Sequence, residues 1–188
     1  IVMGKYAYDT PDAWVDFIEK DTTGPTLVSL EVVNLSSGNY AAGTEIKIEA
    51  TFSEECDYDK STFPVLEIKI GDGDVRTLTG VPGRKTVDYT YTVALEDEGK
   101  LTAISFVGTV YDMLGKFTSF TEAELTGPEI FIKTAVKVTT NINGDKYYSS
   151  LNEALTKTSG VAEFEMLLDD ELTSGIDVTE SDEYTLNL

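Results

Sequence analysis

A nine-residue stretch near the middle of the chain, KTVDYTYTV at Lys85–Val93, constrains the fold more than any other. Apolar and polar residues alternate through it, and a period of two places the apolar set on one face of a β-sheet. Its β-branched and aromatic residues suit a half-buried pleated surface. We therefore predict a central antiparallel strand with one face in water. We expect Tyr89 and Tyr91 to point into the core rather than to form a sugar-binding surface.

Strands of the same kind are predicted on both sides of this stretch. They span Thr26–Val33, Glu45–Phe52, Pro64–Ile70, Val75–Thr79, Leu101–Val107 and Glu129–Thr134. The alternation assigns Val28 and Ile104 to the core faces of their strands. The Gly71–Asp74 segment predicts a tight hairpin turn. About seven short strands with turns every 8–12 residues are typical of a β-sandwich, so the predicted fold class is mainly β.

Four motifs within residues 21–134 resemble the bacterial Ig-like domain. They are DTTGPT at Asp21–Thr26, GNYAAGTEIKI at Gly38–Ile48, TFSE at Thr51–Glu54 and DMLGK at Asp112–Lys116. They occur in the family's order and depart from its pattern at Gly24, where the family has Ala, and at Lys116, where it has Asn. The resemblance implies an Ig-like antiparallel β-sandwich over residues 21–134. It also implies an extracellular setting, in tandem arrays on secreted or surface-anchored bacterial proteins.

Residues 135–188 predict a small α+β segment. A strand is expected at Val136–Thr140, and a helix is expected after Ser150, which has capping-box spacing to Glu153. We expect Gly160 to end this helix. Further strands are expected at Ala162–Leu168, Ile176–Thr179 and Tyr184–Leu188. The segment resembles the entry to a right-handed β-helix in bacterial surface proteins.

Both ends of the chain are interpreted as parts of something longer. Residues 1–20 are interpreted as an N-terminal linker or the end of a preceding domain, with either a short helix after Thr10 or a strand at Trp14–Ile18. The alternation in Tyr184–Leu188 continues to the last residue, whereas domains normally end in polar linker. We therefore expect the natural chain to continue past Leu188.

Composition excludes several functions. The formal charge is −20, with 34 acidic and 14 basic residues, so duplex nucleic acid and anionic membranes are poor partners. No apolar run is long enough to predict insertion into a membrane. Histidine is absent and Cys56 is the one cysteine, which excludes His-based zinc sites, His-based triads and an internal disulfide. No nucleophile motif or phosphate-binding loop is present, so we expect no enzymatic activity.

The clustered carboxylates make calcium the one candidate ligand. We expect no other cofactor. Asp21 and Asp112 are the candidate metal ligands, because in the Ig-like resemblance their loops meet near one end of the sandwich. The acidic loop formed by Glu54, Glu55, Asp57 and Asp59 is interpreted as solvated. Asp72-Gly73-Asp74 is interpreted as a hairpin turn because it lacks the spacing of an EF-hand loop.

Two functions remain open. The first is a structural or adhesion module that acts as a spacer or presents other domains, with a host or cell-wall glycan or protein as its partner. The second is a carbohydrate-binding module that supports a surface-associated enzyme. Burial of Tyr89 and Tyr91 favours the first, and an exposed aromatic pair or a conspicuous groove favours the second. A third option places an active site on a β-helix beyond Leu188.

Overall fold

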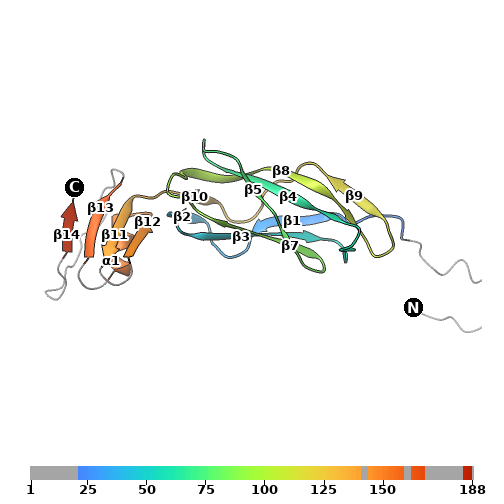
Figure 1. Ribbon diagram of the computed structural model, residues 1–188, viewed down its shortest axis with the longest axis horizontal. Helices are drawn as coiled ribbons and strands as arrows, with labels where there is room; N and C mark the ends of the chain where they lie inside the picture. The colour runs from blue at the N-terminus through green and yellow to red at the C-terminus, as the bar shows by residue number, and fades with distance from the viewer. Residues whose placement is uncertain (1–20, 141–143, 159–161, 168–183, 188) are drawn as a thin grey trace, which may run out of the picture.

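The computed structural model describes residues 21–140, 144–158, 162–167 and 184–187. Within these ranges the protein is mainly β, with fourteen strands and one helix. Figure 1 shows an elongated molecule that the chain enters at one end, at Asp21, and crosses to β14 at the other. The sequence predictions for residues 1–20, Gly160, Leu168, Ile176–Thr179 and Leu188 lie outside the described residues.

Two sheets formed by residues 21–134 face each other, and we call this part the two-sheet unit. The first sheet has the strand order β1 (Leu27–Val32), β3 (Glu45–Phe52), β7 (Thr86–Thr92) and β6 (Val81–Pro82). All of its neighbours are antiparallel. As predicted, β7 lies inside the sheet, with Val87 and Tyr89 buried and Asp88 and Thr90 exposed.

The second sheet is built around β8 (Gly99–Tyr111), its longest strand. Its order is β2 (Gly38–Tyr40), β10 (Ile130–Ile132), β8, β4 (Thr62–Ile70) and β5 (Arg76–Leu78), and β9 (Phe117–Phe120) also pairs with β8. The β4–β5 hairpin turns at residues 71–75, as predicted. One pair in this sheet is parallel, between β10 and β2.

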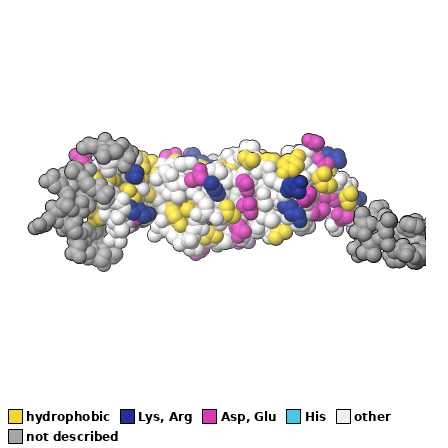
Figure 2. Space-filling model, turned by 90° about the horizontal axis from the view of Figure 1, so that it is seen from below, with side chains coloured by type: hydrophobic (Ala, Val, Ile, Leu, Met, Phe, Trp, Pro, Cys, Tyr) yellow, Lys and Arg dark blue, Asp and Glu magenta, His cyan; other side chains and the backbone are white. Residues whose placement is uncertain are grey.

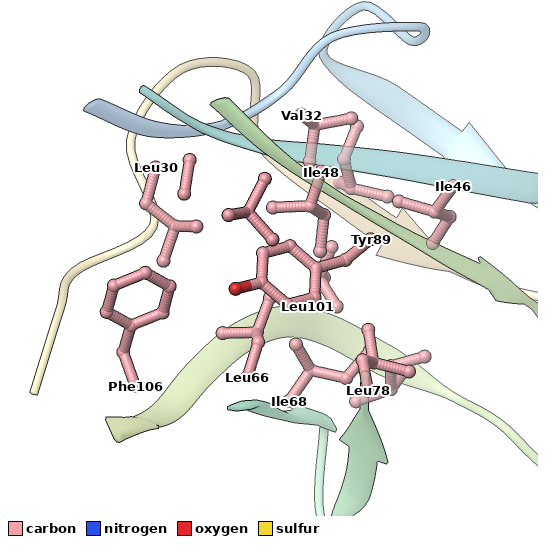
Figure 3. Packing of buried hydrophobic residues seen from close by; sticks show 14 of the residues in the cluster. Leu30, Val32, Ile46, Ile48, Leu66, Ile68, Leu78, Tyr89, Leu101 and Phe106 are labelled. Atoms are coloured by element: carbon pink, nitrogen blue, oxygen red, sulfur yellow. The ribbon is translucent and has the colours of Figure 1, made fainter. Parts of the chain in front are cut away.

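The core lies between the two sheets and is filled by the inward residues of both. Figure 3 shows the Tyr89 ring between Ile48 of one sheet and Leu66 of the other. Its hydroxyl donates a hydrogen bond to the carbonyl of Pro64 at 2.6 Å, and its ring packs edge-on against Phe106. Tyr91 is partly buried against the same core. Both tyrosines therefore face inward, as predicted.

Two core assignments from the alternation are wrong, and both fail at a β-bulge. Val28 is 64% exposed and Ile104 is 47% exposed. The β1–β3 register shifts between Leu27 and Ser29, and the β4–β8 register shifts so that Ile104 has no opposite residue in β4. An extra residue in one strand turns that side chain out of the alternation. Residues 21–134 also form ten strands rather than the seven predicted, and several of them have only two to four residues.

The C-terminal part has a sheet and a core of its own. Its strands are β11 (Val136–Thr140), β12 (Gly144–Tyr148), β13 (Ala162–Met166) and β14 (Tyr184–Asn187), in the order β12-β11-β13-β14. Helix α1 (Leu151–Lys157) packs on it through Leu151 and Ala154. The predicted cap is present, since the Ser150 hydroxyl accepts a hydrogen bond from the Glu153 amide at 3.1 Å. The helix ends at Lys157 on an extended Thr158.

A short connection joins the two parts. The Thr134 hydroxyl is buried and accepts a hydrogen bond from the Ala42 amide at 2.9 Å. On its other side, the Ala135 amide donates to the carbonyl of Tyr148 at 2.9 Å. The Thr134 side chain therefore ties the connection to the two-sheet unit, and the Ala135 backbone ties it to β12. The two parts are arranged one after the other along the long axis in Figure 1.

Candidate metal centre

Three segments meet at the end of the two-sheet unit where the chain enters. They are the leading segment Asp21–Thr26, the loop after β3 and the loop after β8. The leading segment is tied to the loop after β3, because the Ser53 amide donates to the Thr26 carbonyl at 2.9 Å and the Thr26 amide donates to the Ser53 hydroxyl at 3.0 Å. A Cβ atom at Gly24 would lie 2.3 Å from the backbone of Phe117. Glycine therefore allows the leading segment to lie against β9.

Asp112 organises the loop after β8. Its carboxylate Oδ1 accepts hydrogen bonds from the amides of Leu114 at 2.8 Å and Lys116 at 2.7 Å. The turn closes through Gly115, whose φ of +84° is a left-handed conformation that favours glycine. A bridge between Cys56 and Asp112 holds the loop after β3 beside this turn. The Asp112 carboxylate is thus held in place by backbone amides of its own loop.

The cluster itself consists of Asp21, Glu54 and Asp112. One oxygen from each lies within 4.8 Å of the other two. Asp112 is 1% exposed, and its second oxygen, Oδ2, has no hydrogen-bond partner among the described residues. A buried carboxylate oxygen without a partner is costly, because it has lost its water and gained nothing in return. This oxygen is the strongest indication that the cluster binds a cation.

The electrostatics of Glu54 support the same interpretation. Burial raises the pKa of its carboxyl above the ordinary value, and the charges of Asp21 and Asp112 raise it further. The ammonium of Lys85 lowers this pKa, but it is the smallest influence, and its nitrogen hydrogen-bonds to the Ser53 carbonyl at 3.4 Å. Three carboxylates thus repel one another with little compensation from the protein. A bound cation would remove both the repulsion and the orphaned oxygen.

The donor set fits calcium. Ca²⁺ binds six to eight oxygens at about 2.3–2.6 Å, so two oxygens on one ion lie at most about 5 Å apart. The spacing within the cluster falls inside this limit. A soft metal would prefer sulfur or imidazole, but the chain has no histidine and the Cys56 thiol is directed at the Glu54 carbonyl, 3.6 Å away. Asp21, Glu54 and Asp112 are therefore suited to a hard cation.

The sequence indicated two of these three residues. Asp21 and Asp112 lie close together, as the meeting of their loops predicted. Glu54 was instead grouped with Glu55, Asp57 and Asp59 in a solvated loop. Of those four, only Glu54 joins a carboxylate cluster within the described residues. What places Glu54 in the cluster is its position next to Ser53, whose backbone pairs with the leading segment, and this contact is seen only in the structure.

The other acidic residues of that loop have local partners or lie in solvent. Glu55 pairs with Arg84 at 3.5 Å and Asp57 pairs with Lys60 at 3.0 Å. The hydrogen bond from Lys60 is the main reason that the pKa of Asp57 is lowered. Asp59 is exposed. These residues match the solvated loop that the sequence favoured.

Aromatic side chains lie on the surface at the same end of the molecule. The rings of Tyr111 and Phe117 pack with centroids 5.1 Å apart, and Phe117 is 57% exposed. Figure 2 shows hydrophobic side chains beside acidic ones at the right-hand end of the described surface. At the other end, a groove of about 500 Å³ lies between the two-sheet unit and β12, with Val93, Tyr147 and Tyr148 in its walls. Both features belong to the set that favours carbohydrate binding.

A scan against protein-family models found no match, and a search of curated proteins found no significant similarity. Among the described residues, no helix is long and apolar enough to cross a membrane.

Proposed function

We propose that this chain is a non-catalytic structural or adhesion module of a bacterial cell-surface or secreted protein. In this proposal residues 21–134 are a bacterial Ig-like sandwich that acts as a spacer or presents other domains. The observation that carries it is the path of the chain, which enters the two-sheet unit at Asp21 and leaves at Thr134, at opposite ends (Figure 1). Such a unit holds the segments on its two sides apart. The four motifs and the two facing sheets support the family assignment.

Residues 135–188 form the entry to a right-handed β-helix in the same proposal. The parallel pairing of β13 with β14 supports it, because stacked coils of a β-helix are joined by parallel pairs. A cell-wall or host glycan or protein is the partner of the surface protein as a whole.

A swap experiment tests the spacer function. In the full surface protein, residues 21–134 are replaced by an unrelated β-sandwich of similar length, and adhesion and surface exposure are measured. A spacer tolerates the swap, so adhesion is kept. Deletion of the same residues shortens the protein and reduces adhesion. Loss of adhesion after the swap, with normal surface exposure, would show that residues 21–134 carry a binding site and would reject the spacer function.

Calcium reinforces the entry end of this module. Asp21, Glu54 and Asp112 would hold the ion, which supplies the positive charge that the cluster lacks. The orphaned Oδ2 of Asp112 supports this assignment. We expect weak affinity, with a dissociation constant of about 10⁻⁴–10⁻³ M as in extracellular modules, because three carboxylates from separate segments form an incomplete ligand loop.

Calorimetric titration of the full chain with CaCl₂ tests this. We expect binding and a rise in Tm, both lost in Asp112→Asn and both kept in the control Asp72→Asn, which changes an exposed carboxylate in the β4–β5 turn. MgCl₂ should bind more weakly because Mg²⁺ requires shorter, octahedral contacts. No heat and no change in Tm at about ten times this dissociation constant would reject the calcium site.

Carbohydrate binding is a second candidate, because the exposed ring of Phe117 packs against the partly buried ring of Tyr111. A glycan array, and then titration with any glycan it identifies, tests this function. Phe117→Ala should abolish binding, whereas Val81→Ala, which truncates an exposed side chain of β6, should not. The absence of binding to any cell-wall or host glycan would leave the spacer function as the better proposal.

A further inference from the structure

The C-terminal sheet presents an open strand edge on the side of the two-sheet unit. β12 is the first strand of the order β12-β11-β13-β14, and among the described strands it pairs with β11 alone. In Figure 1 it is the strand of this sheet that lies nearest the two-sheet unit. Alternate backbone N–H and C=O groups of an edge strand have no partner in their own sheet, so they are available to another chain.

The groove of about 500 Å³ beside β12 follows this edge. Its walls include four consecutive residues of the strand, at positions 145–148. Successive side chains of a strand point to opposite faces, so a groove on one face of the sheet would contact only every second residue. Contact with four consecutive residues therefore places the groove along the backbone edge. The opposite wall belongs to the two-sheet unit and consists of residues 42–44, Val93 and Leu95.

The two walls leave room for one extended segment and exclude a second sheet. A strand added to β12 lies about 4.8 Å from it, and any further strands of that partner would extend in the same direction, into the opposite wall. Hydrogen bonds hold this wall together, since the Gly43 amide donates to the Val93 carbonyl at 2.8 Å and the Val93 amide donates to the Thr44 carbonyl at 2.9 Å. A folded second copy of this chain is thus kept from the edge, whereas a single peptide segment is not.

Side chains along the groove define the chemistry of that segment. Leu95 is 52% exposed and offers apolar surface. Lys146 is exposed and makes no ion pair among the described residues. The charge of its neighbour Asp145 is already compensated, by the Lys137 ammonium at 3.1 Å and the Thr139 hydroxyl at 2.7 Å. The segment that fits carries an acidic residue on the side of Lys146 and apolar residues on the other side, which is the alternation of a strand.

We propose that β12 binds an extended peptide by β-strand addition, in the groove between β12 and the two-sheet unit, and that this peptide alternates apolar residues with an acidic one. In this mode of recognition the backbone hydrogen bonds supply affinity, and the side chains at alternate positions supply the preference. A glycan lacks the regular spacing of N–H and C=O groups that a strand edge pairs with. The proposal goes beyond the spacer function. Its test measures peptide binding directly, so the two can fail separately.

An NMR titration of the isotope-labelled full chain tests the proposal. The probe is the synthetic peptide acetyl-Ser-Thr-Val-Glu-Val-Thr-Ser-amide. We expect saturable shifts in the amide signals of β12 and of Leu95. A second peptide carries N-methyl groups on its three central residues, which keeps every side chain and removes the amide protons that pair with a strand edge. This peptide should not bind.

Two variants test the side chains of the groove. Lys146→Glu should lower the affinity for the probe about fivefold, and it should raise the affinity for a peptide with lysine in place of glutamate by a similar factor. Its control is Lys47→Glu, which makes the same change of charge at an exposed position of β3. Leu95→Ala should weaken binding of both peptides. Its control is Val81→Ala, which truncates an exposed side chain of β6 and should leave binding unchanged.

The absence of shifts at about 1 mM probe would overturn the proposal. Equal binding of the N-methylated peptide would overturn it too, because the backbone edge would then have no part in recognition. So would shifts at β14, the other end strand of the sheet, without shifts at β12. The titration is repeated with cellohexaose and chitohexaose. Shifts of the β12 signals by either sugar, and none by the peptide, would assign the groove to carbohydrate instead.

Discussion

Two buried aspartates stand at opposite ends of β8, and they differ in how completely the protein satisfies them. Asp97 precedes the strand and Asp112 comes after it, and they are 4% and 1% exposed. Both oxygens of Asp97 have partners. Arg76 donates to Oδ1 at 3.2 Å, and the Tyr91 hydroxyl and the Ala94 amide donate to Oδ2. Asp112 has partners on Oδ1 alone, and other carboxylates lie beside it.

The difference separates a structural carboxylate, Asp97, from a candidate metal ligand, Asp112. At Asp97 the fold supplies its own cation, and the hydrogen bond to Asp97 is the main reason that the pKa of Arg76 is raised. The pKa of Tyr91 is raised too, first by burial and then by its hydrogen bond to Asp97. At Asp112 the fold supplies two amide donors and more negative charge. A buried charge is stabilised by a partner, and this is the basis for proposing that the second site takes a cation from solution.

The largest effect is expected at Asp97, whose two carboxylate oxygens both have partners. Asp97→Ala leaves the Tyr91 hydroxyl and the Ala94 amide without their acceptor and leaves Arg76 paired with Glu96 alone. We expect a loss of about 3 kcal/mol in the free energy of unfolding. Urea unfolding measures it, with Asp88→Ala on the exposed face of β7 as the control. The loss should be the same with and without calcium. A loss that calcium reverses would break the distinction between the two aspartates.

A slightly smaller effect is expected at Asp112, and it should depend on calcium. In Asp112→Asn the amide oxygen can still accept from Leu114 and Lys116, while the NH₂ group can donate to the neighbouring carboxylates. Metal-free stability should therefore change little. At calcium about 100 times the dissociation constant, however, the variant should lack the roughly 2.7 kcal/mol that binding adds to the wild type. Melting curves with calcium and with chelator measure both parts.

A strong loss of stability in metal-free Asp112→Asn would contradict this account. It would show that Asp112 acts through the turn alone, as Asp97 acts through its hydrogen bonds. Asp112→Ala serves as the positive control for the turn, because it removes the acceptor of both amides and should destabilise the protein in either condition.

The alternation of residues was sufficient to predict most strands, since β3, β4 and β7 bury every second residue. It failed at Val28 and Ile104 because a bulge adds one residue to one strand, and the cause lies in the partner strand rather than in the local sequence. Three short strands, β2, β6 and β9, were missed. β6, for example, has two residues, too few to show any period.

The candidate site was predictable only where a motif fixed the loop. The DMLGK turn fixes the position of Asp112. The leading segment, which carries Asp21, meets this turn. Glu54 was missed because its neighbours in sequence are acidic as well, and a one-dimensional pattern does not show which carboxylate faces inward. The partners of Asp97 come from positions 76, 91 and 94, so its network was also outside the reach of sequence reasoning.

A third effect should appear at Cys56, whose segment borders the cluster. Burial, and after it the charge of Glu54, raise the pKa of its thiol to about 11. Labelling at pH 8 should therefore be slow and should require local opening of residues 53–57. If opening releases Glu54 from the ion, calcium at ten times the dissociation constant should slow labelling about tenfold.

Thiol labelling under native conditions measures this protection, and the Asp112→Asn variant is its control, in which calcium should have no effect. An unchanged labelling rate in wild type, under conditions where calorimetry shows that calcium is bound, would mean that the loop after β3 does not hold the ion.

The smallest effect is expected from Glu54→Gln, and it has opposite signs with and without calcium. Burial and the charges of Asp21 and Asp112 raise the folded-state pKa of Glu54 above its ordinary value of 4.5. A carboxyl whose pKa is higher in the folded than in the unfolded state contributes its full stability below pH 4.5. This contribution is lost as the pH rises through the folded-state pKa. Glutamine has no charge to lose. At pH 7 in chelator the variant should therefore be the more stable protein, by about 0.5 kcal/mol for one relieved contact between like charges.

This advantage should vanish near pH 4, where the wild-type carboxyl is protonated. With calcium at pH 7 the order should reverse, because the variant has lost a ligand. Melting temperatures at the two pH values measure it, and Glu55→Gln is the matched control, since Glu55 pairs with Arg84 outside the cluster. A metal-free variant that is less stable than wild type at pH 7 would show that Glu54 is already compensated within the fold, as Asp97 is.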